Sequence, residues 1–183
     1  MNKGIRAILD DITGKREIKK IRGADLTKKS KAPLNKAYVF HYPNPKTRNR
    51  LDYWMEYPVM IIIGKQGDTV LGLSLQHLTY TYSIKLAREI ARRIKNKKAG
   101  IKYFDVKKAM MSAKIPQAML YFAIRAYKTN RIPGNVYAVE MSEYVEALKR
   151  VPRKSKKMGL GSAIKSNMAK YYEYLRKSKK KGK

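Results

Sequence analysis

The sequence predicts an α+β protein in which a small antiparallel β-sheet or hairpin packs with several helices, with basic extensions at both ends. Strand-like runs between glycine and proline turns come first, and helical periodicity follows from residue 83. Hydrophobic residues make up 44% of the 183 residues, which is enough for a real core. The predicted divisions are an N-terminal arm over 1–36, a core over 37–150, and a linker, helix and tail over 151–183.

The N-terminal arm is rich in lysine and arginine and weakly patterned. Apolar residues over 5–12 fit one short amphipathic helix that stops near Gly14. The segment after it is typical of an extended arm that becomes ordered only on a partner. A leader that stays solvated fits the same residues equally well.

Three strand-like runs begin the core. Ala37–Tyr42 is β-rich and ends at Pro43. Val59–Ile63 and Thr69–Leu75 flank the loop Gly64–Asp68, which contains two glycines. This pattern predicts a β-hairpin.

After these strands the apolar residues have helical spacing, and Ser83 is the expected N-cap of the helix that begins there. Two further helices are predicted over Val106–Ala113 and Gln117–Lys128, separated by Pro116. A short strand is expected over Asn135–Glu140.

The C-terminal part begins with a helix over Ser142–Arg150, for which Ser142 is the expected cap. A second helix fits Ser162–Lys177, and Lys177–Lys183 is interpreted as a flexible polycation.

Charge is the most informative property of the composition. The 43 Lys+Arg against 13 Asp+Glu give a formal net charge of +30, which repels itself unless a polyanion neutralises it. Nucleic acid is the commonest such polyanion, and release of its counterions drives binding. An anionic membrane is the competing partner, and a protein that is merely soluble and basic is the plainest alternative.

Several classes are disfavoured. The chain has no cysteine, which excludes disulfides, thiolate zinc sites and cysteine nucleophiles. Its N-terminus lacks the apolar run of a signal peptide, and the apolar stretch Pro58–Ile63 is too short to span a bilayer. We expect a soluble protein, intracellular or enclosed in a particle, with no membrane partner.

In the helix that is predicted to begin at Ser83, the cationic residues spaced by three and four positions share one face, namely Lys85, Arg88, Arg92 and Lys95. Such a face is the most concrete phosphate-binding feature of the core, although isolated cationic faces are often only solvated. The predicted nucleic-acid-binding residues are Lys85, Arg88, Arg92, Arg93, Lys95, Lys97, Lys98, Arg153, Lys154, Lys156, Lys157, Lys179, Lys180 and Lys181.

Two other patterns are weaker. Met158–Ser162 contains G-x-G before a helix, but without a Walker pattern it is better interpreted as a flexible basic linker. The chain has 14 tyrosines and 3 phenylalanines, and some tyrosines, such as Tyr121 and Tyr127, alternate with cations. Those tyrosines are suited to base stacking, whereas most tyrosines are expected to pack with their hydroxyls at the surface.

Catalysis is not expected. His41 and His77 lie within or at the end of predicted strands, and no His/Asp/Glu cluster has metal-ligand spacing. Asp10-Asp11 followed by Glu17-Ile18-Lys19 resembles a Mg²⁺-holding arrangement, but it lies in the arm, which lacks a rigid platform. We therefore expect no enzyme activity, no metal and no cofactor.

Three aromatic blocks occur in order: Tyr38–Pro43, Leu51–Pro58 and Leu71–Leu78. In order and spacing they resemble a tailed-phage family often labelled DNA end protector, over about residues 37–95. Members of that family carry an aromatic strand, an L-x-Y-Y/W block and an L-G-L-N-L-H-Y-L block. Ser74 stands where that family usually has Asn.

The resemblance implies a virion protein associated with the packaged genome, present in the host cytoplasm during assembly. Such a protein shields linear DNA ends or lies near the portal and neck, beside other virion proteins. The three blocks themselves are aromatic and apolar, so they indicate core architecture and not an active site.

The resulting hypothesis is a non-enzymatic protein that binds duplex DNA independently of sequence, since no recognition helix or zinc module is evident. One alternative is a neck, tail or baseplate assembly protein whose basic arms dock on acidic protein neighbours. Another is an RNA-binding, ribosome-associated protein. No heptad pattern predicts an oligomeric state.

Overall fold

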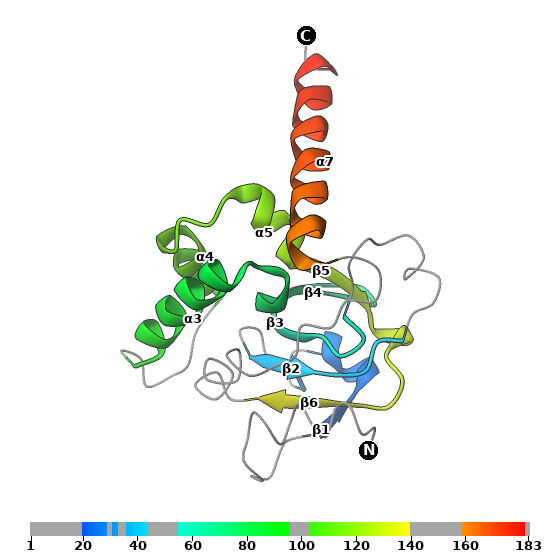
Figure 1. Ribbon diagram of the computed structural model, residues 1–183. Helices are drawn as coiled ribbons and strands as arrows, with labels where there is room; N and C mark the ends of the chain where they lie inside the picture. The colour runs from blue at the N-terminus through cyan, green and yellow to red at the C-terminus, as the bar shows by residue number, and fades with distance from the viewer. Residues whose placement is uncertain are drawn as a thin grey trace.

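The computed structural model describes residues 20–28, 31–32, 36–43, 55–95, 103–139 and 159–181. Within these ranges the strands form one antiparallel sheet in the order β1-β6-β2-β3-β4-β5, with helices beside it (Figure 1), so the predicted α+β class is confirmed. The strands are β1 (Lys20–Arg22), β2 (Ala37–Val39), β3 (Val59–Gln66), β4 (Thr69–Leu73), β5 (Ile124–Lys128) and β6 (Asn135–Val139). The α-helices are α3 (Tyr80–Lys95), α4 (Tyr103–Ser112), α5 (Gln117–Ala123) and α7 (Leu160–Lys181); the 3₁₀ helices are η1 (Gly23–Thr27), η2 (Leu75–His77) and η3 (Thr129–Arg131).

The predicted hairpin is present as β3 and β4, but its loop is shorter than expected. Gln66 pairs with Thr69, so only Gly67 and Asp68 form the turn. Gly67 has a φ of +54°, which a two-residue hairpin turn requires at its first position and glycine adopts without strain. The residues before it, from Gly64, extend β3 instead of forming a loop.

Part of the predicted N-terminal arm belongs to the sheet. Ile21 of β1 pairs with Val136 of β6, and the side chains of Leu26 and Ala32 are fully buried. The prediction of an extended arm is therefore wrong for residues 20–28, while residues 1–19 lie outside the described ranges. A three-residue strand has a single inward side chain, which leaves no periodic signal in the sequence.

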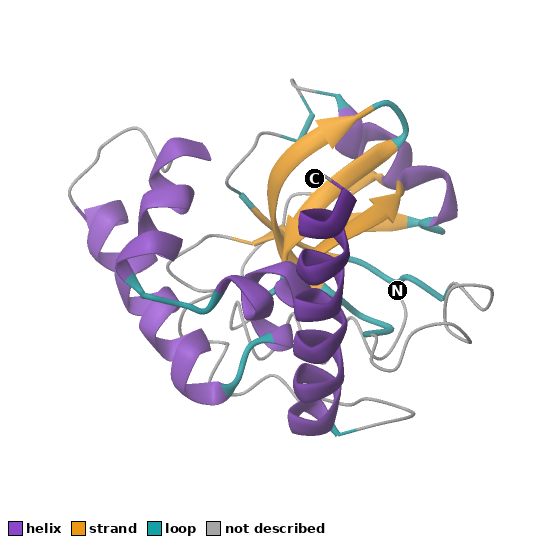
Figure 2. Ribbon diagram, turned by 90° about the horizontal axis from the view of Figure 1, so that it is seen from above, coloured by secondary structure: helices purple, strands orange, loops and turns teal. Residues whose placement is uncertain are grey.

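The sheet is buried on both faces because successive side chains of each strand point to opposite sides. One face packs against α3 and α4, whose Leu86, Ile90 and Val106 are buried in the same cluster as Ile61 and Val139. Residues of the other face form a second cluster, which includes Tyr38, Phe40, Met60, Ile62, Val70, Tyr127 and Leu26. Figure 2 shows that the strands of the sheet curve.

Helix α3 begins earlier than predicted. Its first residue is Tyr80, and the Ser83 hydroxyl donates to the Tyr80 carbonyl oxygen at 2.9 Å. Ser83 is therefore inside the first turn, and its assignment as N-cap is wrong. Its backbone N–H donates to the Thr79 oxygen at 2.9 Å, which continues the helical hydrogen-bonding pattern toward the N-terminus.

The helix predicted over Gln117–Lys128 ends at Ala123. The remainder is strand β5, in which Ile124 pairs with Leu73 and Lys128 pairs with Thr69. The apolar spacing in this segment fits a helix, but the free backbone groups of β4 provide a ladder of hydrogen bonds that local periodicity does not reveal.

The other predicted elements fall as follows. The strand over 135–140 is confirmed as β6, and the helix over 106–113 is confirmed as α4, which starts at Tyr103. The helix predicted over 162–177 is confirmed as α7, but α7 continues to Lys181, so the flexible polycation is wrong for residues 177–181. The helix predicted over 142–150 lies outside the described residues.

Segment η2 carries buried polar side chains next to α5. The Gln76 side-chain oxygen accepts the Val59 N–H at 3.0 Å, which fixes η2 to the start of β3. The His77 ring meets the Phe122 ring edge-on at 5.4 Å between centroids. Burial holds the pKa of His77 well below 6.5, and the positive charge of Arg125 lowers this pKa further.

We expect the free energy of unfolding to fall as the pH drops below about 6.5. The unfolded chain then takes up a proton on His77 that the folded chain excludes, so stability is complete above that pH and decreases by up to about 1.4 kcal/mol per pH unit below it. Urea unfolding at pH 7.5, 6.5 and 5.5 measures this, and His77→Gln should remove most of the slope. His41→Gln, at the partly exposed second histidine, is the control and should retain it. An unchanged slope in His77→Gln contradicts the prediction.

Candidate nucleic-acid interface

The cationic face of α3 is on its solvent side. Leu86 and Ile90 are fully buried on the inner side, which turns Lys85 and Arg88 outward. The Lys85 ammonium lies 5.6 Å from the centroid of the Tyr82 ring, one turn earlier. The predicted placement of these two cations on one exposed helix face is correct.

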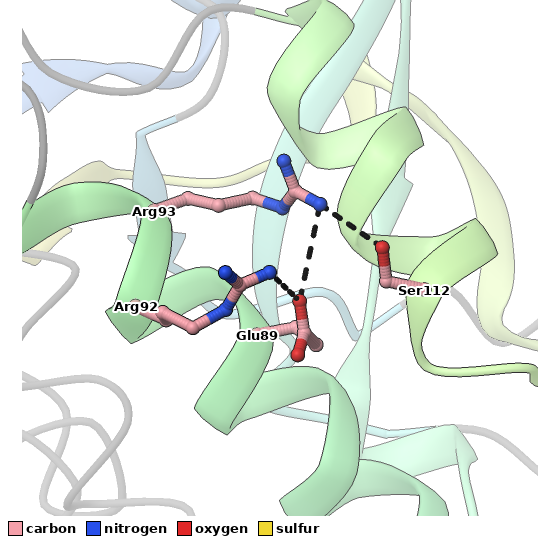
Figure 3. A network of polar contacts seen from close by, with 4 residues as sticks. All are labelled: Glu89, Arg92, Arg93 and Ser112. Atoms are coloured by element: carbon pink, nitrogen blue, oxygen red, sulfur yellow. Dashed lines mark hydrogen bonds and ion pairs between the residues drawn. The ribbon is translucent and has the colours of Figure 1, made fainter.

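A carboxylate competes for the arginines farther along α3 (Figure 3). Glu89 Oε2 lies 2.9 Å from Arg92 Nη2 and 3.9 Å from Arg93 Nη2. Arg93 Nη2 also donates to Ser112 Oγ of α4 at 3.0 Å. Arg93, whose side chain is 21% exposed, therefore joins α3 to α4, whereas Arg92 is 62% exposed and remains within reach of a ligand.

Replacing Glu89 with Gln is expected to tighten DNA binding about threefold at low salt. The change removes one negative charge and releases Arg92, which is mostly exposed, from its ion pair. Fluorescence anisotropy with a labelled duplex measures the affinity. Asp68→Asn, in the exposed turn between β3 and β4, changes the net charge equally and serves as the control. Equal tightening by both variants would show that the ion pair on α3 has no specific effect.

Helix α7 is the most extended cationic element (Figure 1). It has 22 residues and is therefore about 33 Å long. Its start packs on α5, where Ala163 and Ile164 share a buried cluster with Phe122, and its far end stands away from the sheet. Its described exposed cations are Lys165, Lys170, Arg176 and Lys177, and its backbone also includes Lys179, Lys180 and Lys181.

An acid on α7 is paired locally. Glu173 Oε1 lies 2.7 Å from Lys177 Nζ, one turn later. The hydrogen bond from Lys177, followed by its positive charge, lowers the pKa of the exposed Glu173 carboxyl. An exposed pair of this kind contributes little to stability, so Lys177 can exchange Glu173 for an external anion at small cost.

Tyrosines gather where α5 meets α7. The rings of Tyr121 and Tyr171 are 5.5 Å apart between centroids, and those of Tyr171 and Tyr172 are 5.7 Å apart. The Tyr171 hydroxyl donates to the Gln117 side-chain oxygen at 3.2 Å. Tyr121 is 63% exposed, so the junction presents an aromatic surface beside the cations of α7.

The predicted site residues divide between two places. Lys85, Arg88 and Arg92 lie together on α3, which ends at Lys95, and Lys179–Lys181 lie at the end of α7. Figures 1 and 2 place these two helices on separate parts of the domain. The remaining predicted residues, Lys97, Lys98, Arg153, Lys154, Lys156 and Lys157, lie outside the described ranges.

Some exposed cations were missed by the sequence prediction. Lys165, Lys170 and Arg176 lie on α7, and Lys107 and Lys108 lie on α4. A helix over Ser162–Lys177 was predicted, but its cations were not included among the predicted binding residues, although the exposed side of such a helix would carry Lys165, Lys170 and Arg176.

No family model, curated protein or solved structure matches the chain. Within the described ranges, no three His, Cys, Asp or Glu residues gather in a way that could hold a metal ion. The helices of those ranges include none that is long and apolar enough to cross a membrane.

Proposed function

We propose that this protein is a non-enzymatic nucleic-acid-binding protein that binds duplex DNA through its phosphates, independently of sequence. The observation that carries the proposal is α7, a 22-residue helix that is anchored at one end and carries seven cations against the single acid Glu173. A helix of this length spans roughly ten base pairs, since a duplex rises about 3.4 Å per pair.

Sequence independence is supported by the kind of cation exposed. Lysine, which dominates α7, offers a point charge that suits phosphate, whereas base recognition relies on paired donors such as the planar fork of arginine. The second cationic surface, on α3, points away from the sheet on another part of the domain. Two separated surfaces suit contact with more than one stretch of a polyanion.

Placement in a tailed-phage virion is part of the same proposal. Its support is the resemblance of the aromatic blocks to proteins labelled DNA end protectors. In the structure, Tyr38, Phe40 and Leu73 of these blocks are buried in the core, where they have an architectural role. Binding to linear duplexes and to closed circles of equal length tests the finer point, because end protection requires a preference for the linear form.

The decisive experiment for DNA binding is the dependence of affinity on salt. The full chain should bind a labelled 30-base-pair duplex with a slope of log K against log salt of about −5 or steeper, because each phosphate contact contributes about −0.9. Scrambling the duplex sequence should leave the affinity unchanged. Affinity that stays constant between 50 and 200 mM salt overturns the phosphate-contact proposal.

One observation favours the assembly protein as a second candidate. Tyr172 is 50% exposed and Tyr174 is 66% exposed on the projecting half of α7. Exposed tyrosines beside cations are typical of surfaces that dock on proteins. If the protein copurifies with particles after their DNA is removed by nuclease and does not bind the free duplex, the assembly function replaces the DNA-binding one.

A further inference from the structure

Arg125 on β5 is a partly buried arginine without a hydrogen-bond acceptor in the described part of the chain. Its Nε atom is buried and makes no hydrogen bond there, and no described carboxylate forms an ion pair with it. Its guanidinium carbon lies 4.6 Å from the centroid of the Phe122 ring. The residue as a whole retains intermediate exposure, so it is not completely enclosed by the core.

This arrangement is costly for the protein alone. A guanidinium removed from water needs acceptors to replace its hydration, and the Phe122 face compensates only in part. Burial lowers the pKa of Arg125, yet an arginine remains charged at neutral pH. The guanidinium lies over the Phe122 ring and has no counterion among the residues that the structure describes.

Ser74 provides an independent indication beside it. Its hydroxyl is fully buried and has no hydrogen-bond partner in the described residues. Gly72 pairs with Arg125 across the ladder, and the Ser74 N–H donates to Ala123 O at 3.0 Å, which continues that pairing. Since Ser74 has an extended backbone two residues after Gly72, it shares the face of the ladder that carries Arg125.

We propose that Arg125, with Ser74 beside it, forms an oxyanion site that receives one phosphate group of the bound nucleic acid. The proposal rests on the DNA-binding function. The site lies next to the base of α7, because Phe122 contacts both the Arg125 guanidinium and the cluster that holds Ala163 and Ile164. The oxygens of a phosphate supply the charged acceptor that arginine binds most strongly.

The first test uses inorganic phosphate and the full chain. At equal ionic strength, phosphate should raise the melting temperature above its value in chloride or acetate, and Arg125→Met should abolish that difference. Arg131→Met, which removes an exposed arginine of η3, is the matched control and should retain it. In chloride, Arg125→Met should melt at the same temperature as the wild type or higher, because it removes a largely buried charge that no described carboxylate neutralises. Equal stabilisation by acetate and phosphate means a carboxylate site and overturns the proposal.

The second test measures duplex affinity for the same variants. Arg125→Met should weaken binding about tenfold, and Arg131→Met by less than about threefold. If both variants bind as the wild type does, the phosphate site is refuted while DNA binding stands. If the wild type binds no duplex but phosphate stabilises it through Arg125, the proposed function fails and the oxyanion site alone remains.

Discussion

Neutralising the projecting end of α7 is expected to lower duplex affinity by about 10²- to 10³-fold at 100 mM salt. The variant replaces Arg176, Lys177, Lys179, Lys180 and Lys181 with glutamine, which preserves helix propensity. Each lost phosphate contact also makes the salt slope shallower by about 0.9, so the slope should change by up to about 4.5. Titrations at several salt concentrations measure both quantities.

A charge-matched variant distinguishes α7 from net charge. Replacing five exposed cations elsewhere with glutamine, namely Lys107, Lys108, Lys114, Lys128 and Arg131, removes the same charge without changing α7. This control should lose less than about tenfold in affinity, since distant charges are screened within about 10 Å. Equal losses in the two variants would mean that overall charge, and not α7, governs binding. Circular dichroism verifies that both variants retain their helices.

Phe40→Ala is expected to reduce the free energy of unfolding by about 3–5 kcal/mol. The Phe40 ring is fully buried and meets the rings of Tyr127 and Tyr42 edge-on, at 5.3 and 6.2 Å between centroids. Truncation leaves a cavity among these rings, and the sheet around them cannot close it completely. Urea denaturation at pH 7.5 measures the change.

Phe40→Leu is the corresponding control and should cost clearly less, because most of the buried volume is retained. If Phe40→Ala unfolds at the urea concentration of the wild type but loses DNA binding, the aromatic block has a direct functional role. The structure favours the architectural role, since Phe40 lies inside the second hydrophobic cluster.

The sequence identified those elements whose signal is local. The hairpin of β3 and β4 follows from two β-rich runs around Gly67, and α3 follows from apolar residues at helical spacing. The elements that were missed depend on pairing across long stretches of chain. Strand β1 forms only because β6, more than a hundred residues later, offers a free edge, and β5 is extended because β4 does.

The candidate interface was predictable in the same limited way. The outward position of Lys85 and Arg88 follows from helix geometry, and the pairing of Glu89 with Arg92 is visible as a spacing of three residues. The sequence around Arg125 contains no local pattern that predicts its burial, because this burial results from the pairing of β5 with β4 and from the ring of Phe122. Lys177–Lys183 was interpreted as a flexible polycation, although lysine is a good helix former and α7 continues to Lys181.

The attachment of α7 at one end makes it a lever. Its buried residues, Ala163 and Ile164, lie in its first turns, and the helix is about 33 Å long. Contacts with α5 continue as far as Tyr171, so about 15 Å of the helix projects beyond them, and a rotation of about 10° there moves the tip by about 3 Å. On the proposed DNA-binding function, such a rotation would let the charged tip follow a curved duplex without a change in the sheet.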